Sequence, residues 1–255
     1  MASFVAGSAS TVISTTSASG ANTGAYTAGA GSNRVVVVAI TAEQQTTPNT
    51  QDVSAITLGG NALTKIGEQH AGASAGYLED VYLYYLKEAD IQSGSQTLSV
   101  TMVHDGNDLM CQVFTLADID QTTSIGTPVG SSAGSATAEQ SFTTTASDSI
   151  LVTVCGHTAS SSGVWTPATS SGTNVEILDA QTGSGSAGFT MCTDYMVPGS
   201  IATFTAGATC AANNGTAAGM MMLTVEFFNG TGGGPTANPK NPFGLVFTGP
   251  FGGPI

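Results

Sequence analysis

The stretch NRVVVVAITAEQ, Asn33 to Gln44, places four consecutive valines ahead of an Ala-Ile pair. Successive side chains of a β-strand point to opposite faces of the sheet, so a strand with one face in water alternates apolar and polar residues. The apolar run from Val35 to Ile40 does not alternate. It therefore predicts a strand that is covered on both faces.

Most of the chain consists of similar β-runs separated by clusters of Gly, Asn, Asp and Ser, which are typical turn residues. Helical periodicity is nearly absent, and its one short candidate, 87–92, is expected to be a turn. Strands at this spacing predict an all-β sandwich or barrel. The runs that we predict as strands are 35–41, 54–58, 62–67, 78–87, 96–103, 109–117, 149–156, 174–180, 188–196, 200–205 and 219–228.

The second half of the chain echoes the first at a spacing of about 110 to 115 residues. NRVVVVAI corresponds to DSILVTVC, Tyr85 corresponds to Tyr195, and Val113 lies near Met222 in the same frame. We therefore predict pseudo-repeated halves, each a similar strand–hairpin–strand unit. Packed face to face, the two units would form one antiparallel β-sandwich.

Composition divides the chain into three parts. Residues 1–32 form an N-terminal Ser/Thr/Gly-rich segment, in which short strands fit and a helix does not. Residues 33–229 are predicted to form the β-sandwich domain, as one domain rather than two. Residues 230–255 contain five of the nine prolines, which exclude a regular helix or a central strand and favour an extended C-terminal arm.

The C-terminal arm carries apolar side chains that a free polar tail does not need. We expect these side chains to form an interface, either on the chain's own sandwich or on a neighbouring subunit. The residues concerned are Phe243, Leu245, Phe247 and Phe251.

Charge excludes several classes of partner. Charged residues make up 8% of the chain, and four basic residues face seventeen acids, for a formal net charge of −13. Nucleic acids and anionic membranes attract clustered Lys and Arg, so neither is expected as a partner. Natural sheets often protect their edges with lysine, and this chain has only Lys65, Lys87 and Lys240. The scarcity of lysine favours a subunit whose sheet edges are covered in an assembly.

The four cysteines, Cys111, Cys155, Cys192 and Cys210, lack the CxxC spacing of a zinc site. We expect buried free thiols, with Cys192–Cys210 as the first candidate for a bridge. The N-terminus has neither a basic region nor an apolar run of signal-peptide length, so no standard export signal is predicted. No run is long enough to span a membrane.

Four segments together resemble a β-sandwich module, of the concanavalin-like or jelly-roll kind, that recurs in phage and environmental bacterial proteins. They are GSNRVVVVAI (31–40), ITLGGNALTKIG (56–67), VYLYYLKEADIQSGSQTLSV (81–100) and FTLADIDQTTSIGTP (114–128). The resemblance covers about 31–229, with Tyr84 in place of the usual Trp and with the N-terminal segment and the arm added. It implies a structural or binding role in virion or extracellular assemblies and brings no catalytic residues.

Catalytic signals are absent from the sequence. Nucleophilic catalysis needs a histidine beside an activated Ser or Cys, and His70, His104 and His157 are the candidate histidines. A GxSxG nucleophile elbow also needs a strand–turn–helix context, which the near absence of helical periodicity does not provide. No local pattern selects a pair of carboxylates for glycoside hydrolysis. We therefore expect no enzymatic activity and no cofactor.

The densest polar cluster is a weak candidate for calcium. Oxygen atoms of Asp105, Asn107 and Asp108 are ligands of the type that Ca²⁺ takes, although the twelve-residue EF-hand pattern is missing. The alternative, which the sequence favours, is a hairpin turn between strands 96–103 and 109–117.

Three aromatic residues, Tyr82, Tyr84 and Trp165, are candidates for stacking on sugars. Tyr82 and Tyr84 share one face of their strand, and Tyr85 takes the other. Packing in the core or at an interface is the competing explanation, because tyrosine-rich strands pack well in sheets.

Taken with the resemblance, these features predict a non-enzymatic structural protein of a bacteriophage virion, such as a head decoration or accessory subunit. It would be assembled in the host cytoplasm as a homo-oligomer, for which a trimer is our expectation. Its partners would be other copies of itself and virion proteins such as the major capsid protein. The alternative is a carbohydrate-binding or adhesive surface module.

Overall fold

The computed structural model is almost entirely β-strand, so the predicted all-β, antiparallel sandwich is confirmed. The one helical element among the described residues is a 3₁₀ turn, η1 (Glu88–Asp90), where the sequence predicts a turn. No described helix is long and apolar enough to cross a membrane. The structure describes residues 1–44, 53–70, 78–103, 107–133, 137–158, 165–167, 174–182, 189–210 and 220–230.

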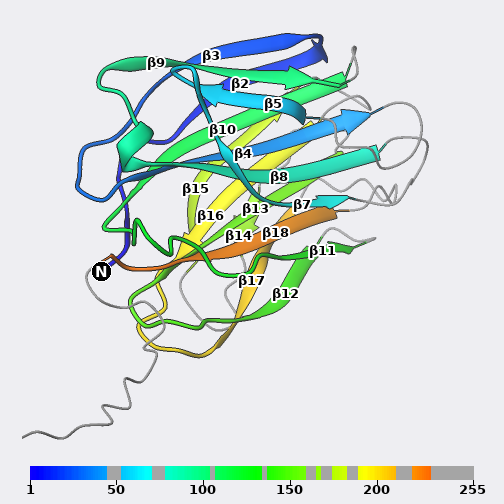
Figure 1. The fold of residues 1–255 in the computed structure, drawn as a ribbon. Helices are drawn as coiled ribbons and strands as arrows, with labels where there is room; N and C mark the ends of the chain where they lie inside the picture. The colour runs from blue at the N-terminus through cyan, green and yellow to red at the C-terminus, as the bar shows by residue number, and fades with distance from the viewer. Residues whose placement is uncertain are drawn as a thin grey trace, which may run out of the picture.

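The first half of the chain forms two sheets (Figure 1). Its inner sheet has the order β1-β10-β4-β8-β7, with β2 also paired to β10, and its outer sheet has the order β3-β9-β5-β6. The strands are β1 (Ser3–Phe4), β2 (Ser10–Ala18), β3 (Ala21–Thr27), β4 (Val35–Gln44), β5 (Val53–Leu58), β6 (Asn61–Ala62), β7 (Thr64–His70), β8 (Leu78–Lys87), β9 (Ser95–Met102) and β10 (Asn107–Ala117).

The second half forms two further sheets. The inner one has the order β11-β18-β13-β16-β15, and the outer one has the order β12-β17-β14. The strands are β11 (Val129–Ala133), β12 (Thr137–Thr143), β13 (Ile150–Thr158), β14 (Trp165–Pro167), β15 (Val175–Thr182), β16 (Phe189–Met196), β17 (Thr203–Cys210) and β18 (Met220–Phe227).

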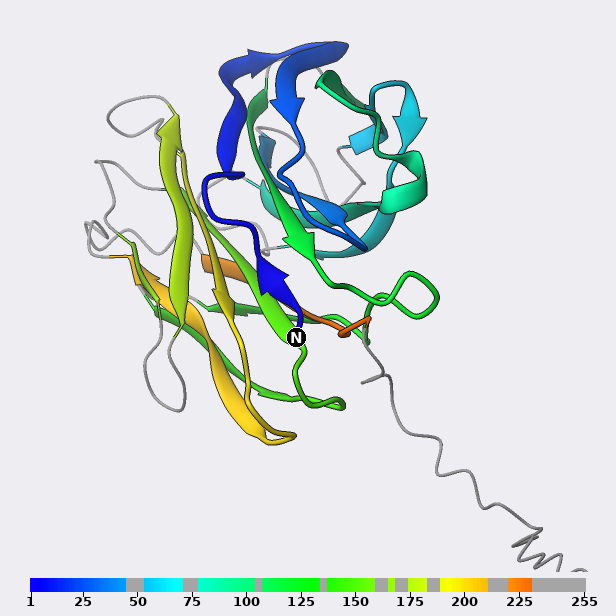
Figure 2. The same ribbon diagram turned by 90° about the vertical axis from the view of Figure 1, so that its left-hand side faces the viewer.

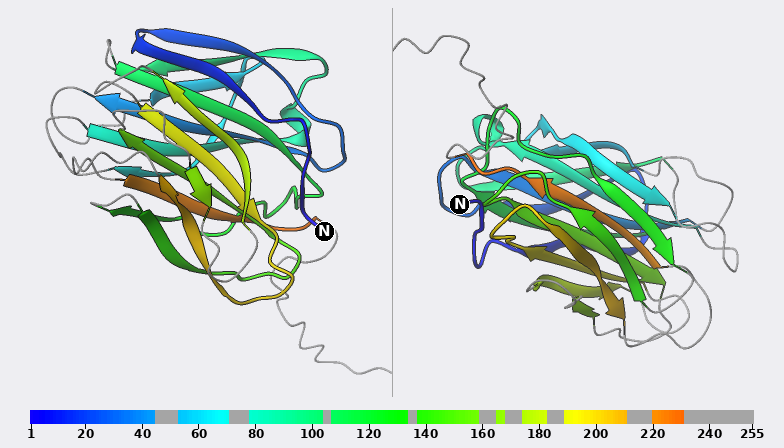
Figure 3. Two further views of the ribbon diagram at one scale, coloured as in Figure 1. Left: turned by 180° about the vertical axis from the view of Figure 1, so that it is seen from behind. Right: turned by 90° about the horizontal axis from the view of Figure 1, so that it is seen from below.

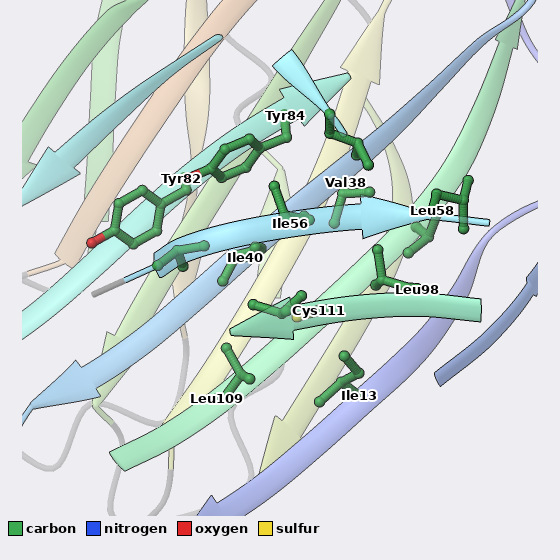
Figure 4. Packing of buried hydrophobic residues seen from close by; sticks show 14 of the residues in the cluster. Ile13, Val38, Ile40, Ile56, Leu58, Tyr82, Tyr84, Leu98, Leu109 and Cys111 are labelled. Carbon is green, nitrogen blue, oxygen red and sulfur yellow. The ribbon is translucent and has the colours of Figure 1, made fainter. Parts of the chain in front are cut away.

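The four sheets stack as four layers, with the two inner sheets in the middle. Val35, Val37 and Ala39 face the core between the inner sheets, where Ile150 and Val152 of the second half meet them. The alternate side chains of β4, Val36, Val38 and Ile40, face the first outer sheet (Figure 4). All six residues of this run are fully buried. The valine strand is therefore covered on one face by its own outer sheet and on the other by the second half of the chain.

Figures 2 and 3 show the two halves, blue to green and green to orange, lying against each other. The edge strand β2 of one inner sheet lies against β15 of the other, and β7 lies against β11. We predicted that the two units together form one sandwich, whereas the structure has two sheets in each half. Each half is itself a two-sheet sandwich, because its inner sheet is apolar on both faces.

The predicted repeat extends to fine details. Asn33 and Asp148, at the same position before β4 and β13, both have positive φ, 49° and 58°. Strands β7 and β15 each have a β-bulge at the same point of the register, at Lys65/Gly67 and at Glu176/Leu178. Tyr85 and Tyr195 occupy equivalent positions.

One predicted equivalence is displaced. Cys111 pairs with Ile40, and Met222 pairs with Cys155, which occupies the position of Ile40 in the second half. The residue equivalent to Met222 is therefore Cys111, and not Val113 two positions along the same face.

The N-terminal segment 1–32 contributes strands to both sheets of the first half. β2 pairs with β10, and β3 pairs with β9. The Phe4 ring lies 5.2 Å from the ring of Tyr195, centroid to centroid, in the core between the halves. The predicted boundary at residue 33 thus falls between β3 and β4, inside the first half.

The proposed hairpin between strands 96–103 and 109–117 is wrong, because the two strands belong to different sheets. β9 pairs with β3 and β5, whereas β10 pairs with β2 and β4. By contrast, a tight turn at Gly59-Gly60 joins β5 to β6, and both glycines have positive φ. The Asp120 carboxylate accepts hydrogen bonds from the amides of Thr122 and Thr123 and so forms a side-chain turn.

The two halves approach each other closely at Gly156 of β13. A Cβ atom at this position would lie 2.9 Å from both Thr41 Cγ2 and Val81 Cγ1. Thr41 and Gly156 are equivalent positions of the two halves. The two inner sheets therefore approach each other at a repeated position where the first half has Thr41 and the second half has a glycine.

Gly156→Val is expected to destabilise the protein, by roughly 1–3 kcal/mol, because overpacking a closed interface forces its neighbours to move. Thermal unfolding would show this as a lower Tm. Gly199→Val is the matched control, since a Cβ there has no heavy atom within 4 Å. Adding Thr41→Ala to the Gly156→Val chain should recover part of the loss. An unchanged Tm for Gly156→Val would contradict the close packing of the inner sheets.

Candidate functional site

The three aromatic residues proposed for sugar stacking lie in the interior. Tyr82 is fully buried, and Tyr84 and Trp165 are 4% and 2% exposed. As predicted, Tyr82 and Tyr84 share one face of β8, toward the outer sheet, while Tyr85 packs on the opposite side. Trp165 packs in the outer core of the second half. None of the three presents a ring for a sugar to stack on, so that assignment is corrected in favour of core packing.

A network of polar side chains lies at the β7–β8 flank of the first half. His70 Nδ1 contacts Asp80 Oδ1, and the Tyr82 hydroxyl donates to Asp80 Oδ2 at 3.1 Å. Lys65 Nζ forms an ion pair with Glu68 and lies 5.4 Å from the centroid of the Tyr82 ring. The strand register brings these residues together, because Glu68 is opposite Tyr82 and His70 is opposite Asp80.

The electrostatics of this network favour the protonated form of His70. The hydrogen bond to Asp80 raises the pKa of His70, against the opposing effect of burial. Its Nε2 lies 3.6 Å from the carboxylate of Glu68. Within the described part of the chain, no Ser, Thr or Cys side chain forms a hydrogen bond with His70. Among the described residues, the network therefore provides an Asp–His pair.

A groove of about 310 Å³ opens beside this network, between the outer and inner sheets of the first half. Its lining is mainly apolar and comes from β5 and from the β6–β7 connection, including Ile56 and Leu63. Lys65 and Tyr84 add polar groups. The Tyr84 hydroxyl is buried without a hydrogen-bond partner, and burial raises its pKa. This groove is the best candidate for a binding site that the described residues offer.

The equivalent flank of the second half is acidic. Asp194 occupies the position of Tyr84, and Glu176 occupies that of Lys65. Asp194 is 1% exposed, and its Oδ2 has no hydrogen-bond partner. Burial raises the pKa of Asp194 well above its usual range, against a hydrogen bond from Thr153. This carboxyl is therefore held in its neutral form inside the fold.

A second buried acid, Glu226 of β18, is fully satisfied. Its carboxylate accepts hydrogen bonds from the Thr145 amide at 2.8 Å, the Thr145 hydroxyl at 2.9 Å, the Ala146 amide at 3.2 Å and the Ser149 hydroxyl at 2.7 Å. It fixes the chain between β12 and β13, so its role is structural. Glu226 also borders a second groove of about 280 Å³ beside β11 and β12.

All four cysteines are buried free thiols, as the sequence predicts. Cys155 and Cys192 lie opposite each other on β13 and β16, and Cys210 shares their core. Burial raises the pKa of the Cys155 and Cys192 thiols, which keeps them protonated and unreactive. The candidate Cys192–Cys210 bridge is not formed.

Two other predicted sites fall largely outside the described residues. Asp105 of the calcium candidate is one of the residues that the structure does not describe, and only the backbone of Asn107 is placed. Asp108 is half-buried, and burial raises its pKa. The arm residues Phe243, Leu245, Phe247 and Phe251 also lie outside the described residues. Among the residues that are described, no three His, Cys, Asp or Glu side chains are placed to hold a metal ion.

Asp194 and the Lys65–Glu68 pair are features that the sequence analysis missed. A signal for Asp194 was present, since it is the one acid in the otherwise uncharged strand FTMCTDYM. The repeat also aligns Tyr85 with Tyr195, which places Asp194 on the same buried face as Tyr84.

Comparisons of the chain with protein-family models, with curated proteins and with solved structures give no match.

Asp194→Asn is expected to stabilise the protein at neutral pH. Because the folded-state pKa of Asp194 is raised, the unfolded chain releases the proton first, and stability falls as pH rises from about 4 toward the folded-state pKa. The amide removes this loss, so the Tm difference between variant and wild type should be small near pH 4 and reach a few degrees at pH 7. Glu139→Gln, at an exposed position of β12, is the control for losing one negative charge. A destabilised Asp194→Asn at pH 7 would show that the carboxylate is ionised and paired.

Proposed function

We propose that this chain is a non-enzymatic structural protein of a bacteriophage particle, a head decoration or accessory subunit that assembles with other copies of itself. Other virion proteins, such as the major capsid protein, would be its further partners. The observation that carries the proposal is the duplicated strand order of the two halves.

In this proposal each half is a jelly roll. The repeated eight strands of a half place the first, eighth, third and sixth side by side in the inner sheet, as β2-β10-β4-β8 and as β11-β18-β13-β16. The fifth strand, β7 or β15, lies beside the sixth at the edge of the inner sheet, and the outer sheets place the second, seventh and fourth together, as β3-β9-β5 and as β12-β17-β14. Two-sheet jelly rolls of eight strands recur in viral capsid proteins and in lectins. This order supports the module that the sequence resembles.

A fold alone supports many functions, so the surface has to distinguish them. The large exposed hydrophobic residues of the described part lie singly on different elements: Met1, Val103, Val129, Val175 and Ile201. Such scattered residues do not form the extended apolar patch of a wide permanent interface. Assembly through a segment that docks on a neighbour fits this surface better, and the apolar C-terminal arm is such a segment.

The carbohydrate-binding alternative has less support. Jelly rolls also include lectins, but the aromatic side chains proposed for sugar stacking are buried. The groove beside Tyr84 is at the small end of the size range of ligand pockets. A screen of glycans against the full-length chain tests this alternative directly, and specific binding that is lost in Tyr84→Phe would favour it.

The proposed assembly is tested by the native mass of the full-length chain and of a chain ending at Asn229, measured over a concentration series. Full-length protein should be oligomeric, and the shortened chain should dissociate with its Tm nearly unchanged. A full-length Phe243→Asp/Phe247→Asp variant controls for effects of shortening. A full-length chain that stays monomeric at every concentration would argue against a self-assembling subunit.

A further inference from the structure

One flank of the first sandwich combines an open strand edge with an apolar groove. β5 pairs with β9 along one edge, but along its other edge β6 covers only Thr57 and Leu58. The amide of Leu63 closes this short hairpin on the carbonyl of Ile56. Among the described strands, none pairs with this edge at Ser54 and Ala55. The strand edge therefore lies open where the groove begins.

The groove floor is apolar and contains an unpartnered donor. Ile56 and Leu63 line it beside Tyr84, whose ring lies next to β5 (Figure 4). The Tyr84 side chain is 96% buried, yet its hydroxyl finds no acceptor among the described residues. A buried hydroxyl without an acceptor costs free energy that a docked carbonyl oxygen can return.

The C-terminal segment contains one stretch suited to this edge. Between Pro242 and Pro250 the sequence is FGLVFTG, the longest proline-free stretch after residue 234. Phe243, Leu245 and Phe247 recur at every second position, which is the period of a strand with one apolar face. Only the N-terminal end of the β5 edge is available to such a strand, since β6 and Leu63 cover Ile56, Thr57 and Leu58.

We propose that residues 243–249 of a second copy of this chain dock in the groove as an extended strand that pairs with β5 at the open Ser54–Ala55 end of its edge. Main-chain hydrogen bonds would hold the added strand, and its alternate apolar side chains would fill the groove, as in other cases of strand addition. A carbonyl of the added strand accepts the hydrogen bond from Tyr84. This inference rests on the proposed function, because it names the surface through which the copies assemble.

A neighbouring copy is the occupant that the described surface favours. The described hydrophobic residues that remain exposed are too scattered to form an interface between copies. Gly230, the last described residue, is fixed to the end of the first half by a 2.6 Å hydrogen bond from its amide to the carbonyl of Asp118, which follows β10. Residues 231–242 lie between this point and the added strand, and a chain of that length extends to about 40 Å at most. That reach is sufficient to pass from one subunit to the groove of the next.

The test compares the association of full-length variants by sedimentation over a concentration series. Ala55→Glu/Ala62→Glu places charge in the groove at two exposed positions and should weaken association at least tenfold. The matched control is Ala25→Glu, an exposed residue of β3 at the opposite edge of the same outer sheet, which should associate like wild type. Tyr84→Phe should weaken association about fivefold, the effect of one hydrogen bond. Its Tm, measured in the Phe243→Asp/Phe247→Asp background, should be unchanged or higher.

A complementation experiment gives the sharpest result. The Phe243→Asp/Phe247→Asp chain keeps an intact groove, and the Ala55→Glu/Ala62→Glu chain keeps an intact arm. Each alone should be monomeric, whereas a mixture should form a one-to-one dimer. No dimer in the mixture would overturn the proposal.

The outcomes separate this inference from the proposed function. If wild type is oligomeric and depends on the arm but not on Ala55, Ala62 or Tyr84, the arm docks elsewhere, and the inference fails while the assembly function stands. If wild type is monomeric and the groove and arm variants lower its Tm by the same non-additive amount, the groove holds the chain's own arm. That result overturns the second copy as occupant, and it also removes the support for self-assembly.

Discussion

The structure depends on the burial of both faces of its two inner sheets. Each inner sheet places one set of alternate side chains against its own outer sheet and the other set against the opposite half. Neither half can cover both faces of its inner sheet alone. The two halves therefore pack together, and a single apolar layer between them buries the remaining face of each inner sheet. The one described side-chain hydrogen bond across this layer runs from the Thr193 hydroxyl to the Gln112 amide oxygen, at 2.8 Å. The stack is therefore held together by apolar contacts and by close packing of complementary surfaces, as at Gly156.

Much of the fold could be predicted because the inner strands are both apolar and bounded by turns. Run 35–41 corresponds to β4 and run 219–228 to β18. Strands β2, β3, β11 and β12 are rich in Ser, Thr and Gly, and they carry few of the apolar signals on which such predictions depend. The four-layer stack could not be predicted from the sequence either. A run of valines shows that both faces are covered, but it does not show what covers them.

The candidate site was less predictable because its chemistry arises from register and burial. Tyrosines of a half-exposed strand and tyrosines of a core strand have the same sequence pattern, so the burial of Tyr82 and Tyr84 required the outer sheet to be placed. Lys65 lies beside a bulge in β7, and no local sequence motif predicts this bulge. A lone acid in a strand normally indicates a solvent face. The burial of Asp194 follows from its equivalence to Tyr84, which the repeat implies.

Duplication followed by divergence gives the two flanks of the molecule different chemistry. Lys65 and Tyr84 of the first half correspond to Glu176 and Asp194 of the second, so an apolar groove with a cation is matched by a flank of carboxyls. In the proposed assembly, a subunit contributes one donor arm and one acceptor groove, so the contact between copies is heterologous. Heterologous contacts close into rings when the rotation between subunits allows it and otherwise continue as filaments. A closed trimer is one geometry that the proposed arrangement permits.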